Sequence, residues 1–140
     1  MIEIGRHAQQ TGRRIAVEIL PRTCLGNTVD ELTALMSELD AAVFGVCMDT
    51  NHLMNRYQTL PDEIRRLGHK LLTLHLSDYD GVDEKHELPG RGVLDWKAFM
   101  AALRAIDYRG PFNYEAKPDG ATPAERFRSY ENNFEWLSKL

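Results

Sequence analysis

Four short apolar runs of the chain each end in a side chain that can bind a metal ion: Glu18, Asp49, His75 and Glu115. Carboxylate oxygens and an imidazole nitrogen together suit a divalent cation such as Mn²⁺, Mg²⁺, Co²⁺ or Zn²⁺. Taken singly, each carboxylate has an ordinary explanation as a helix cap or turn former, and the histidine has one as a core residue. Because parallel strands bring their carboxyl ends to one edge of a sheet, the four together predict a metal centre.

Further polar residues lie on the loops that follow these runs. His52 comes three residues after Asp49, where it can ligate a metal or donate to a substrate oxygen. Glu84 and His86 precede a Gly-Arg-Gly turn in which Arg91 can pair with a phosphate or carboxylate group. The alternative is that these are solvated loop residues. We take His52, Glu84, His86 and Arg91 as candidate substrate-binding residues.

The chain has two cysteines, Cys24 and Cys47, too few for a disulfide framework. Cys47 lies two residues before Asp49 and would share its face on a strand. We interpret both thiols as small apolar side chains rather than as ligands or nucleophiles.

Length and composition favour a globular domain of ordinary size. The chain has 140 residues, of which 43% are hydrophobic and 27% charged, enough for one domain with its own core. No apolar run reaches the ~20 residues of a membrane span, and the first residues lack a signal peptide's apolar segment, so we expect a cytoplasmic protein without a membrane partner. The net charge of −4 disfavours nucleic-acid binding but allows a small anionic substrate.

Strand and helix patterns alternate along the chain. A helix that stops near Gly12 comes first, and each of four predicted strands is then followed by a helical pattern. This order predicts an α/β fold with a parallel sheet and right-handed crossovers. The predicted strands span about 15–20, 43–49, 70–77 and 111–116; the predicted helices begin near residues 28, 61, 95 and 123.

The two faces of the predicted strands differ in character. Bulky side chains occupy one parity, among them Met48, Leu72 and Leu74, and should meet the helices. The other parity, which carries the four candidate ligands, is small and polar. An open sheet covered by helices on both sides should be apolar on both faces, whereas a barrel interior that holds a ligand site need not be. The pattern therefore favours barrel strands.

A complete (β/α)8 barrel needs about 250 residues and eight strands. Four strands in 140 residues predict a partial (β/α)8 TIM barrel, a half-barrel of four parallel βα units preceded by a short helix. We expect residues 1–140 to form one domain that corresponds to the C-terminal half of such a barrel.

Several motifs in order resemble the sugar phosphate isomerase/epimerase family of xylose isomerase-like TIM barrels. This family includes ketose 3-epimerases, hydroxypyruvate isomerases and inosose dehydratases. The resemblance covers nearly the whole chain, and it is specific for the superfamily rather than for a substrate. The motifs are Ile15–Ile19, Asp49-Thr50-Asn51-His52, Leu74-His75-Leu76-Ser77-Asp78, the segment 83–92 and Gly110-Pro111-Phe112-Asn113-Tyr114-Glu115.

The resemblance implies roles for the candidate residues. Glu18, Asp49, His75 and Glu115 match the family's metal ligands, and in the epimerases the first and last glutamates also move protons. His52 and the segment 86–91 match substrate-contacting positions. The implied activity is isomerisation or epimerisation of a small sugar or sugar phosphate, in which a divalent metal stabilises the enediolate formed by proton transfer alpha to a carbonyl.

Two alternatives remain open. An apurinic endonuclease class of the same superfamily has a trinuclear zinc site, which the four ligands together with His52, Glu84 and His86 resemble; the acidic net charge counts against a nucleic-acid substrate. The other alternative is a non-catalytic or truncated half-barrel that needs a partner chain. Four strands leave two unpaired edges, so we expect a homo-oligomer or a missing N-terminal half-barrel.

Overall fold

The computed structural model describes all 140 residues and is built on one parallel sheet with strand order β1-β2-β3-β4. Each strand pairs with its neighbour in chain order, as in one half of a closed (β/α)8 barrel. The predicted fold class is therefore confirmed. The strands are β1 (Ile15–Glu18), β2 (Phe44–Asp49), β3 (Leu71–Leu76) and β4 (Phe112–Tyr114).

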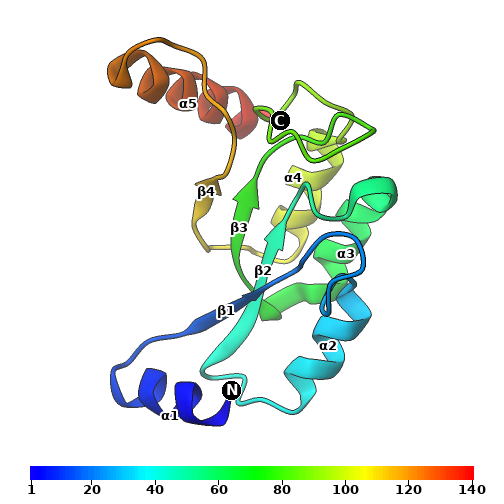
Figure 1. Cartoon of the computed structure of the whole chain (residues 1–140), viewed down its shortest axis with the longest axis vertical. Helices are drawn as coiled ribbons and strands as arrows, with labels where there is room; N and C mark the ends of the chain where they lie inside the picture. The colour runs from blue at the N-terminus through cyan, green and yellow to red at the C-terminus, as the bar shows by residue number, and fades with distance from the viewer.

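Helices connect the strands and cover one face of the sheet (Figure 1). In this view α1 lies beside β1 at one end of the molecule, and α5 lies beyond β4 at the other. None of the helices combines the length and the apolar character needed to cross a membrane. The α-helices are α1 (Ile2–Gln10), α2 (Val29–Ser37), α3 (Leu60–Leu67), α4 (Trp96–Ala105) and α5 (Pro123–Ser138).

Side-chain caps fix the starts of three helices. Thr28 caps α2 by accepting a hydrogen bond from the Glu31 amide, and Asp95 caps α4 in the same way. Thr122 and Glu125 form a reciprocal capping box at the start of α5, as the Thr-Pro-x-Glu sequence predicts. These caps determine where each connection ends.

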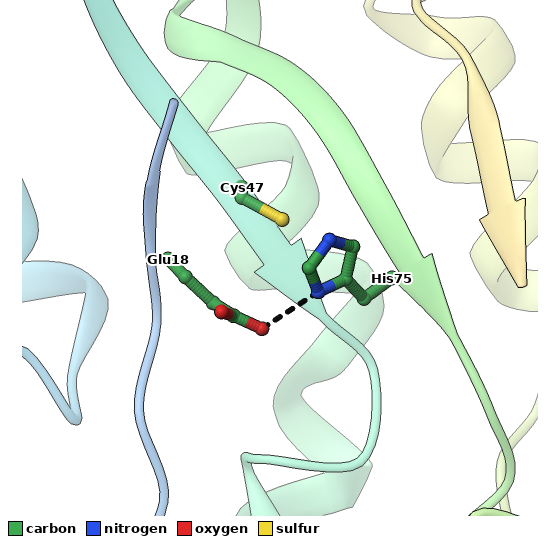
Figure 2. Close-up of side chains that lie close together, drawn as sticks. All are labelled: Glu18, Cys47 and His75. Carbon is green, nitrogen blue, oxygen red and sulfur yellow. Dashed lines mark hydrogen bonds and ion pairs between the residues drawn. The ribbon is translucent and has the colours of Figure 1, made fainter. Parts of the chain in front are cut away.

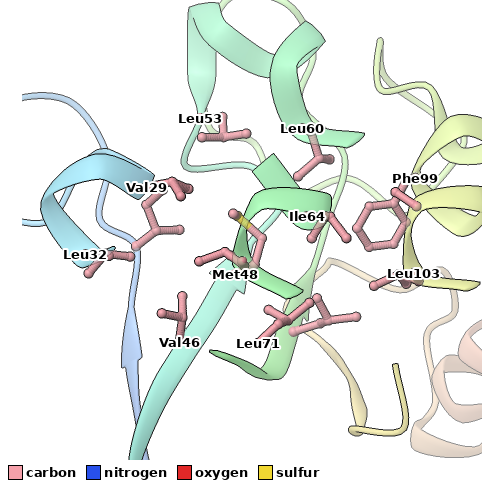
Figure 3. Close-up of a cluster of buried hydrophobic side chains, with 14 of the residues drawn as sticks. Val29, Leu32, Val46, Met48, Leu53, Leu60, Ile64, Leu71, Phe99 and Leu103 are labelled. Carbon is pink, nitrogen blue, oxygen red and sulfur yellow. The ribbon is translucent and has the colours of Figure 1, made fainter. Parts of the chain in front are cut away.

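The hydrophobic core lies between the sheet and helices α2, α3 and α4 (Figure 3). Val46, Met48 and Leu74 are fully buried on the helix-facing side of the strands, where Ile64 and Phe99 pack with them in one apolar cluster. Burying side chains of this size contributes about 1.5–3 kcal/mol each. The core thereby holds β2 and β3, which carry two of the four candidate ligands.

Leu72 of β3 lies on the polar face of the sheet, although the sequence pattern predicted it on the helix-facing side. The β2–β3 register shifts between Val46 and Cys47, so that Leu71 rather than Leu72 enters the core. Leu72 instead lies over Gly45, on the face that carries the polar residues; a Cβ built on Gly45 would lie 2.4 Å from the Leu72 Cγ. The irregularity inserts one residue into the strand and reverses the parity locally.

Two connections differ from the sequence prediction. A 3-10 helix, η1 (Met54–Thr59), precedes α3, where the sequence predicted only a loop. A second 3-10 turn, η2 (Gly68–Lys70), leads into β3. Strands β1 and β4 are shorter than predicted, since β1 ends at Glu18 and β4 at Tyr114.

Asp78 organises the long connection between β3 and α4. Its side chain is fully buried and accepts hydrogen bonds from the amides of Gly90 and Leu94 and from the indole N–H of Trp96. Its own amide donates to the carbonyl oxygen of Glu87. Asp78 thus holds residues 87–96, the second half of the segment that carries Glu84, His86 and Arg91.

We predict that Asp78→Ala destabilises the protein by about 3 kcal/mol, because it leaves three donors without their acceptor. Urea unfolding followed by circular dichroism measures the change. The matched control is Asp62→Ala, which removes an exposed carboxylate paired with Arg65 and should change stability by less than about 0.5 kcal/mol. Equal effects of the two substitutions would contradict the anchoring role of Asp78.

Candidate metal centre

The four predicted ligands converge at the carboxyl ends of the four strands. Glu18 and Asp49 are the last residues of β1 and β2, His75 is the penultimate residue of β3, and Glu115 directly follows β4. One donor atom from each of the four lies within 4.8 Å of the donor atoms of the others. Asp49 and His75 are also direct partners in the β2–β3 ladder.

His75 lies at the middle of the group. Its Nδ1 atom is 2.7 Å from Oε1 of Glu18 and 2.8 Å from Oε2 of Glu115. The two glutamates therefore approach the same point from the two edge strands, Glu18 from β1 and Glu115 from β4. Their side chains are 31% and 49% exposed, so the centre opens toward β4.

Asp49 is the most deeply buried member. Its Oδ1 atom accepts a hydrogen bond of 2.8 Å from the backbone N–H of Asn51, whereas Oδ2 is buried without any hydrogen-bond partner. Burial raises the pKa of Asp49 to about 6, against the opposing effects of the nearby His52 and the Asn51 amide. A buried carboxylate oxygen with no donor is costly unless a cation completes it, so the residues present fit a divalent metal ion.

His52 and the β3–α4 segment form a second group beside the first. The Nδ1 atom of His52 lies 2.8 Å from the Ile19 carbonyl oxygen, and Nε2 lies 3.5 Å from both Asp49 Oδ2 and Glu84 Oε2. If Nδ1 donates to that carbonyl, Nε2 keeps its lone pair for a ligand. Donor atoms of His52, Glu84 and His86 lie within 4.8 Å of one another. The structure therefore brings these three predicted residues together.

Arg91 lies away from both groups. Its guanidinium forms an ion pair with Asp119, with 2.9 Å between Nη1 and Oδ1. It lines a cavity of about 450 Å³ together with Trp136 and other residues of α5. None of the other predicted site residues lines this cavity.

A cavity of about 400 Å³ adjoins His52, with Arg22, Arg56 and Tyr79 among its lining residues. Arg22 pairs with Asp83 and Glu84 and so joins the loop after β1 to the β3–α4 segment. Three non-glycine residues with positive φ surround this region: Arg22 (57°), Met54 (50°) and His86 (53°). Such conformations are strained for side chains of this size and are concentrated at functional sites.

One residue beside the predicted ligands was not assigned to the site from the sequence. Cys47, interpreted there as a small apolar side chain, has a donor atom within 4.8 Å of those of Glu18 and His75. Its position two residues before Asp49 was the available signal. Arg22, a weak candidate from its place just past the first predicted strand, pairs with Glu84 across 62 residues, a contact that no local pattern encodes.

Comparisons with known proteins place the chain in a family. A family profile described as xylose isomerase-like TIM barrel matches residues 1–140. The chain belongs to this family. It is 30% identical over 132 residues to an uncharacterised protein of Sinorhizobium fredii, covering 94% of this chain and 40% of that one. It is 28% identical over 110 residues to the D-psicose 3-epimerase of Enterocloster bolteae, covering 77% of this chain and 35% of the enzyme.

Solved structures agree on the fold. D-psicose 3-epimerase of Clostridium cellulolyticum superposes with a TM-score of 0.82 at 22% identity, covering 98% of this chain and 52% of that one. The 3-keto-D-glucoside 4-epimerase of Escherichia coli gives a TM-score of 0.77 at 23% identity, with 98% and 50% covered. This family member thus spans about half the length of the solved structures it matches.

We predict that His75→Ala weakens Mn²⁺ binding at least ~100-fold, because a direct ligand should contribute no less than the 10–100-fold seen for residues that only support ligands. Isothermal titration calorimetry of the metal-free protein measures the affinity. His69→Ala is the matched control, since His69 lies in η2 at the opposite end of β3 and should leave the affinity unchanged. A similar loss in both variants would argue against a centre at His75.

Proposed function

We propose that this chain carries the metal-binding half of a sugar or sugar-phosphate isomerase or epimerase, which moves a proton at the carbon next to a carbonyl group. The observation that carries the proposal is that Glu18 and Glu115 approach one point from the two edge strands. Their carboxylate oxygens lie 2.7 and 2.8 Å from the Nδ1 atom of His75. Two carboxylates on either side of a bound substrate can respectively remove a proton and return one.

Each residue of the centre has a distinct task in this proposal. Glu18, Asp49, His75 and Glu115 hold the divalent cation, for which Mn²⁺, Mg²⁺, Co²⁺ and Zn²⁺ are all candidates. When bound, such an ion stabilises the negative charge that develops on the carbonyl oxygen as the adjacent carbon loses its proton. Glu18 and Glu115 additionally act as the proton-transfer groups. Return of the proton to the same carbon gives epimerisation, and return to its neighbour gives aldose–ketose isomerisation.

His52, Glu84 and His86 bind the substrate in this proposal. His52 lines the cavity that Arg22 and Tyr79 also line, and donor atoms of Glu84 and His86 lie within 4.8 Å of its own, so a sugar hydroxyl can meet donors and acceptors beside the metal centre. Arg91 is placed to act on a substrate only through the separate cavity beside α5. Among the relatives, enzymes named for D-psicose, L-ribulose and 3-dehydro-D-guloside support a small sugar as substrate.

A second candidate function has one observation in its favour. The group of His52, Glu84 and His86 can hold a metal ion of its own next to the first centre. Two or three adjacent zinc ions would suit a phosphodiesterase related to the apurinic endonucleases. Metal analysis of the zinc-saturated protein separates the two proposals, since one ion per chain favours the isomerase and two or more favour the phosphodiesterase.

The sugar proposal is tested by proton exchange in D₂O. The Mn²⁺-loaded chain is incubated with a panel of ketopentoses and ketohexoses, and proton NMR follows the loss of the C–H signal next to the carbonyl. We expect exchange by the wild type and a rate at least ~100-fold lower for Glu115→Gln, because a positioned proton-transfer group contributes 10²–10⁴-fold. Glu131→Gln, an exposed carboxylate of α5, is the control. An unchanged rate in Glu115→Gln would remove Glu115 from the mechanism.

We also propose that the four βα units, as the C-terminal half of a barrel, associate with four more, supplied by a second copy or by an N-terminal half. The outer edges of β1 and β4 have no strand partner. Exposed apolar side chains lie on the helices beside both edges: Ile2 and Ile4 of α1 and Phe127 and Phe134 of α5, which are 45–71% exposed.

We predict that the isolated chain sediments as a dimer at micromolar concentration. The backbone N–H groups of Ile15 and Ile19 donate to Val43 and Cys47, toward β2. Because successive N–H groups along a strand point to opposite sides, the N–H of Ala16 faces the open edge. Ala16→Pro removes this donor and should shift the species toward monomer, whereas Ala16→Ser keeps it. Circular dichroism verifies that both variants are folded. A monomeric wild type at this concentration would contradict self-association.

A further inference from the structure

Cys47 points into the metal centre from a position two residues before Asp49 on β2. It is 2% exposed, and in the β1–β2 ladder its direct partner is Glu18. Figure 2 shows the thiol directed into the space between the Glu18 carboxylate and the His75 ring. The sulfur, a carboxylate oxygen of Glu18 and a ring nitrogen of His75 lie within 4.8 Å of one another.

The strand ends therefore carry two overlapping sets of donors. Both sets contain Glu18 and His75. Asp49 and Glu115 complete the outer set with oxygen ligands, whereas Cys47 completes the inner set with sulfur. Because β2 places Cys47 and Asp49 two residues apart on one face, the inner set lies one step deeper along the strand.

We propose that Cys47, Glu18 and His75 form a second, deeper cation position that selects thiophilic ions such as Zn²⁺, Co²⁺ and Cd²⁺. The inference rests on the metal centre of the proposed function and assigns to it a sulfur ligand. Soft thiolate ligands favour these ions, whereas Mg²⁺ and Mn²⁺ favour carboxylate oxygens. On binding, a sulfur–metal bond forms, the thiol proton leaves to solvent, and no electrons are transferred.

A second observation independent of the thiol points to a cation here. The Oδ2 atom of Asp49 is fully buried next to this group and has no hydrogen-bond partner. It can complete the coordination of an ion in the deeper position from the same strand. Four protein ligands from three strands are then available without Glu115, whose side chain is 49% exposed: Glu18 of β1, Cys47 and Asp49 of β2 and His75 of β3.

The two positions exclude one another, because they share Glu18 and His75. An ion in the deeper position leaves Glu115 outside its ligand set. Cys47 thus determines which metals the centre accepts. Thiophilic ions compete with the oxygen-preferring ions that occupy the outer set.

The test uses Co²⁺ as a spectroscopic probe, in a Cys24→Ser background because Cys24 is an exposed free thiol. Metal-free protein is titrated with Co²⁺, and the near-ultraviolet thiolate-to-cobalt charge-transfer band is recorded. The Cd²⁺ and Mn²⁺ affinities are then measured by calorimetry for this protein and for Cys47→Val and Cys47→Ser. We expect the band only when Cys47 is present. We also expect the preference for Cd²⁺ over Mn²⁺ to fall by roughly tenfold or more in both variants.

The outcomes separate this inference from the proposed function. If Mn²⁺ binds but no thiolate band appears and the Cd²⁺ preference is unchanged in both variants, the sulfur ligand is refuted and the outer centre stands. If none of the three ions binds at micromolar concentration, the metal centre itself is refuted together with this inference. Mn²⁺ affinity that is kept in Cys47→Val shows that the variant is folded around its outer ligands.

Discussion

The parallel register between β2 and β3 places Asp49 directly beside His75, and the other features of the site are arranged around that pair. Glu18 reaches the same point because β1 ends on the neighbouring side of β2, and Glu115 because β4 ends beside β3. Parallel pairing makes all four strands end at one edge, which no antiparallel arrangement of these segments would do. The loops that carry His52 and Glu84 leave from that edge as well.

The same register explains how the sheet tolerates a buried carboxylate. β2 is buried along its whole length, with Val46 and Met48 on the helix-facing side and Cys47 and Asp49 on the other. Close packing on the first side holds the strand rigidly, so the unpaired Oδ2 of Asp49 cannot move out to water. A cation bound at the proposed centre would offset the cost of this arrangement.

The sequence was informative where local rules apply. The α/β half-barrel followed from alternating strand and helix patterns, and the start of α5 followed from Thr122 and Glu125. The convergence of the four ligands followed from their positions at strand ends. The shifted position of Leu72 did not, because the register irregularity depends on contacts between β2 and β3. The pairing of Arg91 with Asp119 likewise joins loops whose approach no local pattern encodes.

Exposure across the centre indicates what the other half of a barrel would add. Asp49 of β2 is fully buried, Glu18 of β1 is 31% exposed and Glu115 after β4 is 49% exposed, so protection from water falls from β2 toward both edge strands and is least beside β4. All four candidate ligands nevertheless belong to this chain, so the proposed metal centre draws on no further segment. Proton return is different, because a carboxylate open to water exchanges its proton with solvent before it can return it to the substrate. Metal binding and stereospecific proton transfer should thus depend on different parts of a closed barrel: the first on these strand ends, the second on whatever covers Glu115.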